Sequence, residues 1–258
     1  MLRYYRFNAD LPHPAPARPT NVKRPKGGSG WPEHCPPIRA ANAYGWDVIN
    51  PFEMRFTRDA DGEWDLDETV EVHSDIDLDE GGEVSPHPQL NAWFWEQGQT
   101  RPHVITDEVY LAIRHQVKVS TFLYLQTDED ELLWIRGVPN RRRDWSVIES
   151  IVETDWYAPA HPWHTVIELP RIEESPIDEV VIPEGERLCR LVPLRRDAFE
   201  AVEMSAADFG ALFAEGQKWL MAHGRDLLHG DDLDITGQYA KQQRQPKFTV
   251  APDTDAKA

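Results

Sequence analysis

Short runs in which apolar and polar residues alternate dominate the chain up to residue 194. Alternation with a period of two predicts strands that are buried on one face. Such runs include RYYRFNA, FEMRF, TVEV, HTVIELP, EVVIPEGE and RLCRLVPL. DADG supplies a turn between FEMRF and TVEV, and TDED supplies one between VYLAIRHQVKVSTFLYLQ and ELLWIRG, so each is expected to close a β-hairpin. The pattern predicts a mainly β fold, a β-sandwich or a jelly roll.

The pattern changes to a helical period after Ser205. Apolar residues then recur every three to four positions, which predicts one amphipathic helix over about residues 205–228. Ser205 is expected as its N-cap, with Asp208 in the capping-box position. The apolar face of this helix is expected to pack on the sheet.

These elements divide the chain into three segments. Residues 1–37 hold a strand and a loop rich in proline and glycine, which is expected to wrap the surface. Residues 38–230 are predicted to form a single β-rich domain that includes the C-terminal helix, because 40% of the chain is hydrophobic and can build a sizeable core. Residues 231–258 are polar and predict a largely disordered tail.

Charge and cysteine content narrow the expected partners and compartment. The formal net charge of -18 should repel phosphate backbones and anionic lipid surfaces, so neither nucleic acid nor a membrane is expected as a partner. Two cysteines, Cys35 and Cys189, are too few for a disulfide framework. The low cysteine count, the lack of a signal-peptide pattern and the lack of a membrane-spanning run together predict a cytoplasmic protein. Cys189 lies in an apolar run and is expected to be a buried, inert thiol.

Three consecutive arginines mark the loop over residues 136–144 as a candidate ligand site. Arg141 and Arg143 are suited to a carboxylate or a phosphate, because a guanidinium group binds either with two parallel hydrogen bonds. Asn140, in the turn before them, is a further candidate ligand-binding residue. The alternative is a loop whose charges only face water.

The loop over residues 153–164 carries candidate acid–base groups. Asp155 or Glu153 could act as a general base, and a carboxylate beside the aromatic Trp156 could have its pKa raised by desolvation. The alternative is that the carboxylate only caps backbone amides. With Trp156 as a ligand-binding residue, this loop and the 136–144 loop are predicted to form a pocket for a small polar or anionic molecule.

Histidines raise the possibility of a divalent metal. His73 and Asp75 have the spacing of a facial iron site, whose third ligand would be His161 or His164. A metal-dependent enzyme of the non-haem iron and 2-oxoglutarate type would follow, with Arg171 holding the carboxylate of the co-substrate. Matches to so short a motif arise easily by chance, and an ordinary acidic turn is the alternative.

Three consecutive aromatic residues, Trp93, Phe94 and Trp95, form a candidate stacking platform for a sugar or a base. Since alternate residues of a strand face opposite sides, at least one of them is expected in the core. Exposed tryptophans would also suit a protein–protein interaction module, which is a further class of function that the sequence leaves open.

Four segments resemble a bacterial family catalogued as domain of unknown function 6065. They are CPPIRAANAYGWDV, RGVPN, VETDW and IPEGERLCRLVPL. The similarity would cover roughly Pro32 to Leu194. The chain departs from the family at Val138 and Arg187, which stand where the family usually has proline. Because no activity is assigned to the family, the resemblance implies positions of interest and no mechanism.

A weaker likeness is to dUTPase-like proteins of the β-clip fold. SIVETDW followed by GERLCRLV is similar in order to the aspartate-bearing strand and a later strand of those enzymes. The likeness implies a hydrolase in which Asp155 activates water and Arg141 to Arg143 meet phosphates, although the glycine-rich C-terminal motif is missing. The sequence thus leaves open a binding protein, an enzyme and an interaction module, and it does not set the oligomeric state.

Overall fold

The computed structural model describes residues 1–18, 35–75, 86–96, 106–223, 228–229 and 232–233. The chain divides into two compact units. The first consists of Met1–Thr20 with Ala40–Asp197, and the second of Asn21–Arg39 with Ala198–Ala258. In the described part of the chain, no helix is both long enough and apolar enough to cross a membrane.

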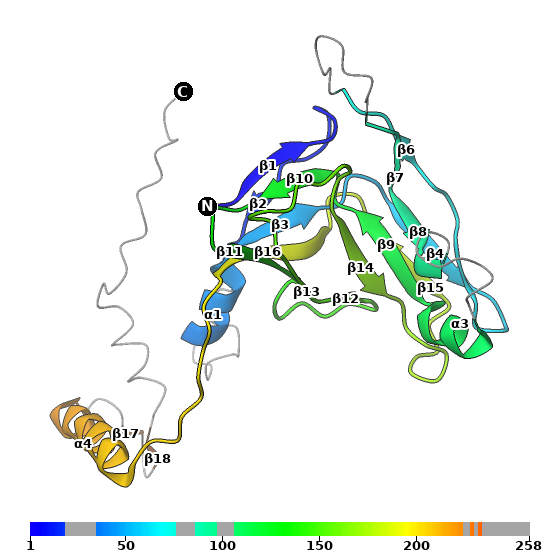
Figure 1. The fold of residues 1–258 in the computed structure, drawn as a ribbon. Coiled ribbons are helices and arrows are strands. Elements are labelled where there is room, and N and C mark those ends of the chain that lie inside the picture. Colours follow the sequence, from blue (N-terminus) through cyan, green and yellow to red (C-terminus); the bar gives the residue numbers. More distant parts are fainter. Residues whose placement is uncertain (19–34, 76–85, 97–105, 224–227, 230–231, 234–258) are drawn as a thin grey trace. The chain divides into compact units, whose positions relative to one another are not determined.

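The first unit is mainly β, as the alternating pattern predicts, and its strands pair in antiparallel fashion (Figure 1). Its strands, in chain order, are β1 (Arg3–Arg6), β2 (Ala15–Pro16), β3 (Trp46–Ile49), β4 (Met54–Arg58), β5 (Trp64–Leu66), β6 (Glu71–Val72), β7 (Gln89–Leu90), β8 (Ala92–Phe94), β9 (Gln116–Ser120), β10 (Leu123–Gln126), β11 (Glu131–Arg136), β12 (Ser146–Ile148), β13 (Ser150–Val152), β14 (His164–Glu168), β15 (Glu179–Ile182) and β16 (Arg187–Arg195). Helix α1 (Pro36–Ala43) precedes β3, and α3 (Asp107–Ile113) precedes β9.

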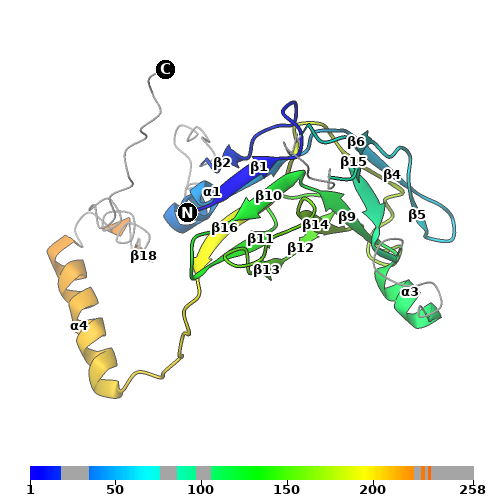
Figure 2. The same ribbon diagram turned by 45° about the horizontal axis from the view of Figure 1, so that its top comes forward.

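The strands of this unit are arranged in several sheets (Figure 2). One sheet has the order β13-β11-β16-β3-β2, a second has the order β12-β14-β9-β8, and a third has the order β15-β4-β5. Strand β1 pairs with β10, and β6 pairs with β7. Consecutive strands often belong to different sheets. The larger sheets contribute to one common core, as expected for the sandwich type of fold that the sequence predicts.

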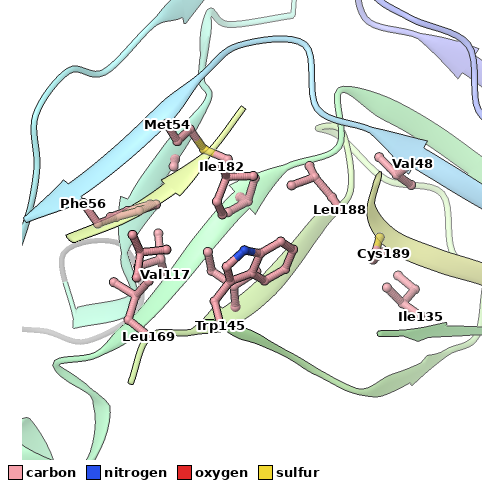
Figure 3. Packing of buried hydrophobic residues seen from close by; sticks show 14 of the residues in the cluster. Val48, Met54, Phe56, Val117, Ile135, Trp145, Leu169, Ile182, Leu188 and Cys189 are labelled. Carbon is pink, nitrogen blue, oxygen red and sulfur yellow. The ribbon is translucent and has the colours of Figure 1, made fainter. Parts of the chain in front are cut away.

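Buried apolar side chains from all three larger sheets form one hydrophobic core. Figure 3 shows the ring of Trp145 between the group around Phe56 and Ile182 and the group around Ile135 and Cys189. The thiol of Cys189 is fully buried, as expected, and burial raises its pKa to about 12, which disfavours the reactive thiolate.

A second hydrophobic cluster lies beneath the N-terminal strand. Its buried members are Phe7, Leu11, Val72 and Phe122, and Phe52, Val70 and Tyr124 pack against it. The pairing of β1 with β10 brings the first residues of the chain to this place, where the backbone N–H of Phe7 donates to the carbonyl of Phe122 at 2.9 Å.

Two of the predicted hairpins turn out differently. DADG does form a turn, with Gly62 at a φ of +85°, but it joins β4 to β5, while TVEV contributes β6 and pairs with β7. TDED is also a turn, yet β10 pairs with β1, and β11 pairs with β13 and β16. The predicted β10–β11 hairpin is therefore wrong, because each strand uses its edges for partners that are distant in the sequence.

The run VYLAI, which the alternation assigned to a strand, lies in helix α3. Thr106 caps this helix by accepting a hydrogen bond from the backbone N–H of Val109 at 3.3 Å. One helical turn apart, Tyr110 and Arg114 both bind Glu63, and the tyrosine hydroxyl donates to its carboxylate at 2.7 Å. These contacts on one helix face explain why helix wins over strand here.

The second unit contains α4 (Ala206–His223) and the short pair β17 (Leu228–His229) and β18 (Asp232–Leu233). The predicted cap is confirmed, since the backbone N–H of Asp208 donates to Ser205 Oγ at 3.1 Å and that hydroxyl donates to Asp208 Oδ2 at 2.6 Å. Packing of this helix on the sheet stays a prediction. The predicted wrapping loop and disordered tail fall largely on residues 19–34 and 234–258, outside the described residues.

One buried ion pair joins α1, β3 and β16. The side chains of Arg190 and Asp47 are almost completely shielded from water, and Arg190 Nε donates to Asp47 Oδ1. Arg190 Nη1 also donates to the carbonyls of Ala41 at 3.0 Å and Tyr44 at 2.9 Å, at the end of the helix, where carbonyls lack intrahelical partners. Arg187 adds a second guanidinium to Asp47 at 2.7 Å.

Gly45 makes this arrangement possible. Its φ of +96° lies in the left-handed region, and a Cβ there would stand 2.5 Å from the carbonyl oxygen of Leu191. Glycine is therefore required where the chain leaves α1 and turns into β3 beside β16.

Replacing Arg190 tests the importance of this ion pair. We expect Arg190→Met to lower the free energy of unfolding by about 3–5 kcal/mol, because it removes the closer counter-ion of a buried carboxylate and the donor to two helix-end carbonyls. Urea unfolding followed by tryptophan fluorescence measures this loss. Arg195→Met, at the exposed end of the same strand, is the control and should shift stability by no more than about 0.5 kcal/mol. Equal losses in the two variants would contradict the role given to Arg190.

Candidate functional site

A cavity of about 610 Å³ opens in the first unit between four segments of the chain. Its walls come from the residues after β1, the connection from β3 to β4, strand β6 with its flanks, and the turn between β15 and β16. Pockets that bind small molecules commonly enclose about 300–1,000 Å³, so this volume suits a small ligand.

The floor of the cavity is apolar. Leu11, Phe52, Val70 and Val72 line it, and the same residues belong to or pack against the second hydrophobic cluster. The ring of Phe52 meets Phe122 edge to face, with ring centroids 6.1 Å apart. A packed cluster under the floor keeps the floor in place, because its side chains cannot move without disturbing one another.

Asn50 joins two of the walls. This side chain is buried, and its Nδ2 donates to the carbonyls of Phe52, Ile182 and Pro183. Its backbone carbonyl accepts from the N–H of Gly185 at 2.8 Å. The connection after β3 is thereby fixed to the turn before β16.

The N-terminal wall is fixed in a similar way. Asn8 Nδ2 donates to the carbonyl of His73 at 3.0 Å, and the N–H of Ala9 donates to Asp75 Oδ2 at 2.6 Å. Ser74 Oγ donates to the carbonyl of Phe7 at 3.0 Å. Asp75, a predicted metal ligand, thus holds a backbone amide of the wall.

The ionisable side chains that line the cavity are mostly acidic. They are Asp10, Glu71, Glu184 and His73, and no lysine or arginine is among the described lining residues. His73 Nε2 lies 3.3 Å from Glu71 Oε1. Within the described part of the chain, Asp10 and Glu184 have no ion-pair partner. The lining side chains are therefore net acidic over an apolar floor, and the nearby guanidinium of Arg6 donates to the main-chain carbonyl of Leu11 at 2.6 Å.

The arginine cluster is used inside the protein. Arg143 Nη2 donates to Glu186 Oε1 at 2.6 Å, Nη1 donates to a main-chain carbonyl of β16 at 3.0 Å, and burial lowers the pKa of this arginine. Arg141 also pairs with Glu186, at 3.2 Å. Asn140, at a φ of +58°, donates to Asn42 Oδ1 at 2.8 Å. The carboxylate expected from a ligand of Arg141 and Arg143 is supplied by the protein itself.

The candidate general bases are held by an arginine as well. Both carboxylate oxygens of Asp155 accept from Arg196 Nη2 at 2.9 Å, and Glu153 accepts from Arg196 Nη1 and from Trp156 Nε1. Burial acts to raise the pKa of Asp155, but the hydrogen bond and charge of Arg196 outweigh it, so this pKa lies below its ordinary value. The expected rise is therefore wrong. Trp156, 66% exposed, is open to solvent.

The predicted metal ligands are not brought together. His73 and Asp75 follow β6, and His73 lines the cavity, whereas His164 begins β14 in another sheet and His161 lies three residues before it. Among the described residues, no three His, Cys, Asp or Glu side chains are grouped so that they could hold a metal ion. The predicted facial site made from these residues is therefore wrong, because its two halves belong to different sheets.

The aromatic run behaves as its alternation predicts. Phe94 is buried in the core, while Trp93 and Trp95 are partly exposed. His164 packs edge-on against Trp93 with ring centroids 4.6 Å apart. Burial, together with the charges of Lys118 and His161, lowers the pKa of His164 to about 3.

Sequence reasoning did not find most of the cavity. Asp10, Asn50, Glu71 and Glu184 lie in four separate segments, and none of them stands in a motif with a known spacing. His73 is the one lining residue that the sequence singled out, as a possible metal ligand. An unpaired carboxylate in a turn has the same local pattern whether it faces bulk water or a cavity.

Comparison with known proteins adds little. No family model and no curated protein matches the chain, so its relation to domain of unknown function 6065 stays a prediction. Among solved structures it is similar to the dUTPase of Staphylococcus bacteriophage 80alpha with dUpNHpp, with 8% identity and a TM-score of 0.34 over 80% of this chain and 88% of that one. Two mutants of that dUTPase, one glycine-to-serine and one aspartate-to-alanine, each have 9% sequence identity to this chain and a TM-score of 0.34. Both matches cover 80% of this chain. They cover 88% of the first mutant and 97% of the second. This slight likeness says nothing about activity.

The buried imidazole of His164 predicts a specific pH dependence of stability. Its folded pKa of about 3 lies below the unfolded value of 6.5, so the unfolded chain takes up the proton first as the pH falls. Stability is therefore lost from about pH 6.5 toward about pH 3, with a slope of up to about 1.4 kcal/mol per pH unit. We expect His164→Gln to flatten the pH dependence of the urea midpoint between about pH 5 and 6.5.

His87→Gln, which alters an exposed histidine, is the control and should keep the slope of the wild type. If His164→Gln has the same slope as the wild type, the imidazole is not buried in the neutral form.

Proposed function

We propose that this protein binds a small organic cation, an amine on a short apolar body, in the cavity of about 610 Å³. The observation that supports the proposal is the combination of an apolar floor with an acidic rim that no neighbouring lysine or arginine neutralises among the described lining residues. An ammonium group would complement the rim, and an apolar body would cover the floor.

The electrostatic part of this affinity is expected to be modest. Asp10, Glu71 and Glu184 face one space, so their charges oppose one another until a cation enters. An ammonium about 4 Å from one carboxylate gains about 1–4 kcal/mol, depending on how much water screens the pair. High salt weakens such an interaction because the cavity is open to solvent.

The apolar part has a similar size. Burying about 100 Å² of ligand surface on Leu11, Phe52 and Val72 contributes about 2.5 kcal/mol. The loss of translational and rotational entropy on binding offsets part of these electrostatic and apolar contributions. A simple amine is therefore expected to bind with a dissociation constant of about 0.1–1 mM. A larger natural ligand that reaches all three carboxylates would bind more tightly.

This proposal keeps the class of function expected from the sequence, a small-molecule binding protein, and changes the site and the charge of the ligand. The sequence expected the pocket at the 136–144 and 153–164 loops, and no residue of either loop lines the cavity. The alternative of an interaction module has its support in the exposed Trp156. A cytoplasmic location stays a prediction, supported by the free thiols of Cys35 and Cys189.

The proposal is tested with two probes of the same shape, 2-phenylethylamine and the neutral 2-phenylethanol. In isothermal titration calorimetry at low salt, we expect saturable binding of the amine and at least about fivefold weaker binding of the alcohol, equal to about 1 kcal/mol. Glu71→Gln and Asp10→Asn should each lower the affinity for the amine about threefold to tenfold and leave the affinity for the alcohol unchanged. Each replacement removes one negative charge and keeps the shape of the side chain.

Glu129→Gln is the matched control, because it removes an exposed carboxylate in the TDED turn that does not line the cavity. It should leave the affinity for the amine unchanged. The proposal fails if the amine and the alcohol bind equally, if neither binds, or if Glu129→Gln weakens the amine as much as Glu71→Gln does.

A further inference from the structure

Three paired strands and the residues next to their ends present a group of aromatic and basic side chains. We call this group the β9 face, and its members are Trp93, Trp95, Lys118, His161 and His164. Strand β9 lies between β8 and β14, and Lys118 is the register partner of Trp93 on one side and of Val166 on the other. Val117 and Val119 point into the core, so alternation puts Lys118 on the opposite surface.

The rings of the β9 face are in contact with one another. His164 meets Trp93 edge to face, with centroids 4.6 Å apart and an interplanar angle of 75°. His161 stacks on His164 with centroids 5.6 Å apart and an angle of 28°. Trp95 lies under the ammonium group of Lys118, whose Nζ is 4.9 Å from the ring centroid. Flat apolar surface and a cation are thus adjacent.

Lys118 has no counter-ion among the residues that the structure describes. In the described part of the chain, no carboxylate lies within ion-pair distance of its ammonium group, although acidic residues outnumber basic ones by 45 to 27 in this protein. The residue is partly buried, and burial lowers its pKa. A partly desolvated cation without an acidic neighbour is suited to receive an anion from outside, because the anion would meet little competition from water.

His164 adds a second polar side chain to the β9 face. Its Nε2 is buried and has no hydrogen-bond partner among the described residues. No hydrogen bond at this nitrogen therefore fixes the orientation of the ring. Because Nε2 is buried, a ligand on the β9 face would meet the imidazole as ring surface and not through this nitrogen.

We propose that the β9 face is a binding site for a small carboxylate that carries a flat ring. The carboxylate pairs with Lys118, and the ring lies against Trp93, Trp95 and the imidazole of His164. This site is independent of the cation proposed for the cavity, because it uses other residues and the opposite charge. Either proposal can fail while the other stands.

The test uses the indole N–H resonances of the full-length protein, labelled with ¹⁵N. Trp93→Phe and Trp95→Phe assign the two signals among the ten tryptophans. Benzoate and 2-naphthoate are the probes. Benzamide keeps the flat ring without the charge, and cyclohexanecarboxylate keeps the charge without the flat ring. We expect saturable shifts of both assigned signals with at least one of the two probes, and at least about fivefold weaker binding of both comparison compounds.

Lys118→Met should lower the affinity for whichever probe binds the wild type by about tenfold or more. Lys118→Arg should retain most of this affinity because it keeps the charge. Lys218→Met is the matched control, since it makes the same replacement at an exposed residue of α4 and should change nothing. The proposal is overturned if neither probe shifts the two signals, if benzamide binds as tightly as benzoate, or if Lys118→Met binds like the wild type. Should Lys118→Met not fold, loss of binding in the folded Lys118→Arg variant would also overturn it.

Discussion

The buried contact between Asp47 and Arg190 is the constraint on which the first unit depends. Both groups have given up water, and their mutual attraction offsets that loss only while both are present. Arg190 belongs to β16 and Asp47 to β3, and the same guanidinium binds the last carbonyls of α1. The contact therefore sets the register of two strands and the end of a helix at once. Asn50 follows directly on β3, and the turn before β16 carries Glu184. The contact therefore also positions two of the four segments that line the cavity.

The cavity and the β9 face are built in different ways. The cavity gathers four segments that are far apart in the chain and holds them with hydrogen bonds to main-chain groups. The β9 face depends largely on the regular pairing of β8, β9 and β14, which puts Trp93, Lys118 and His164 on one surface, while Trp95 directly follows β8 and His161 precedes β14. A change in one strand register would remove the β9 face altogether. The cavity would respond instead to changes in its turns and in the cluster beneath its floor.

Alternation was sufficient to predict the class of fold and many of the strands, because burial on one face leaves a period of two in the sequence. The same rule required at least one residue of the aromatic run 93–95 to be in the core, and the structure shows that it is Phe94. It failed for α3, where a cap at Thr106 and the contacts of Tyr110 and Arg114 with Glu63 select a helix. It also failed to show which strands pair across TDED, since a local pattern does not contain the identity of distant partners.

The roles of charged residues were harder to predict for a related reason. Arg143 meets Glu186, which lies 43 residues away, and Asp155 meets Arg196, which lies 41 residues away. From the sequence alone, each looked free to bind a ligand. Once the fold supplies an internal partner, the charge becomes part of the framework. The groups left for a ligand are those without an ion-pair partner among the described residues, such as Asp10, Glu184 and Lys118.

The floor of the cavity is also the cluster that holds the N-terminal strand in place. Phe7 and Leu11 pack there with Val72 and Phe122, and β1 reaches β10 across the same place. An isolated pair of short strands is only marginally stable, so β1 is expected to separate from β10 more often than the central strands separate from one another. Each such opening would also dismantle a wall of the cavity. A molecule bound in the cavity would therefore disfavour fraying of the N-terminal strand and slow exchange of the β1 amides with solvent, although no residue of β1 lines the cavity.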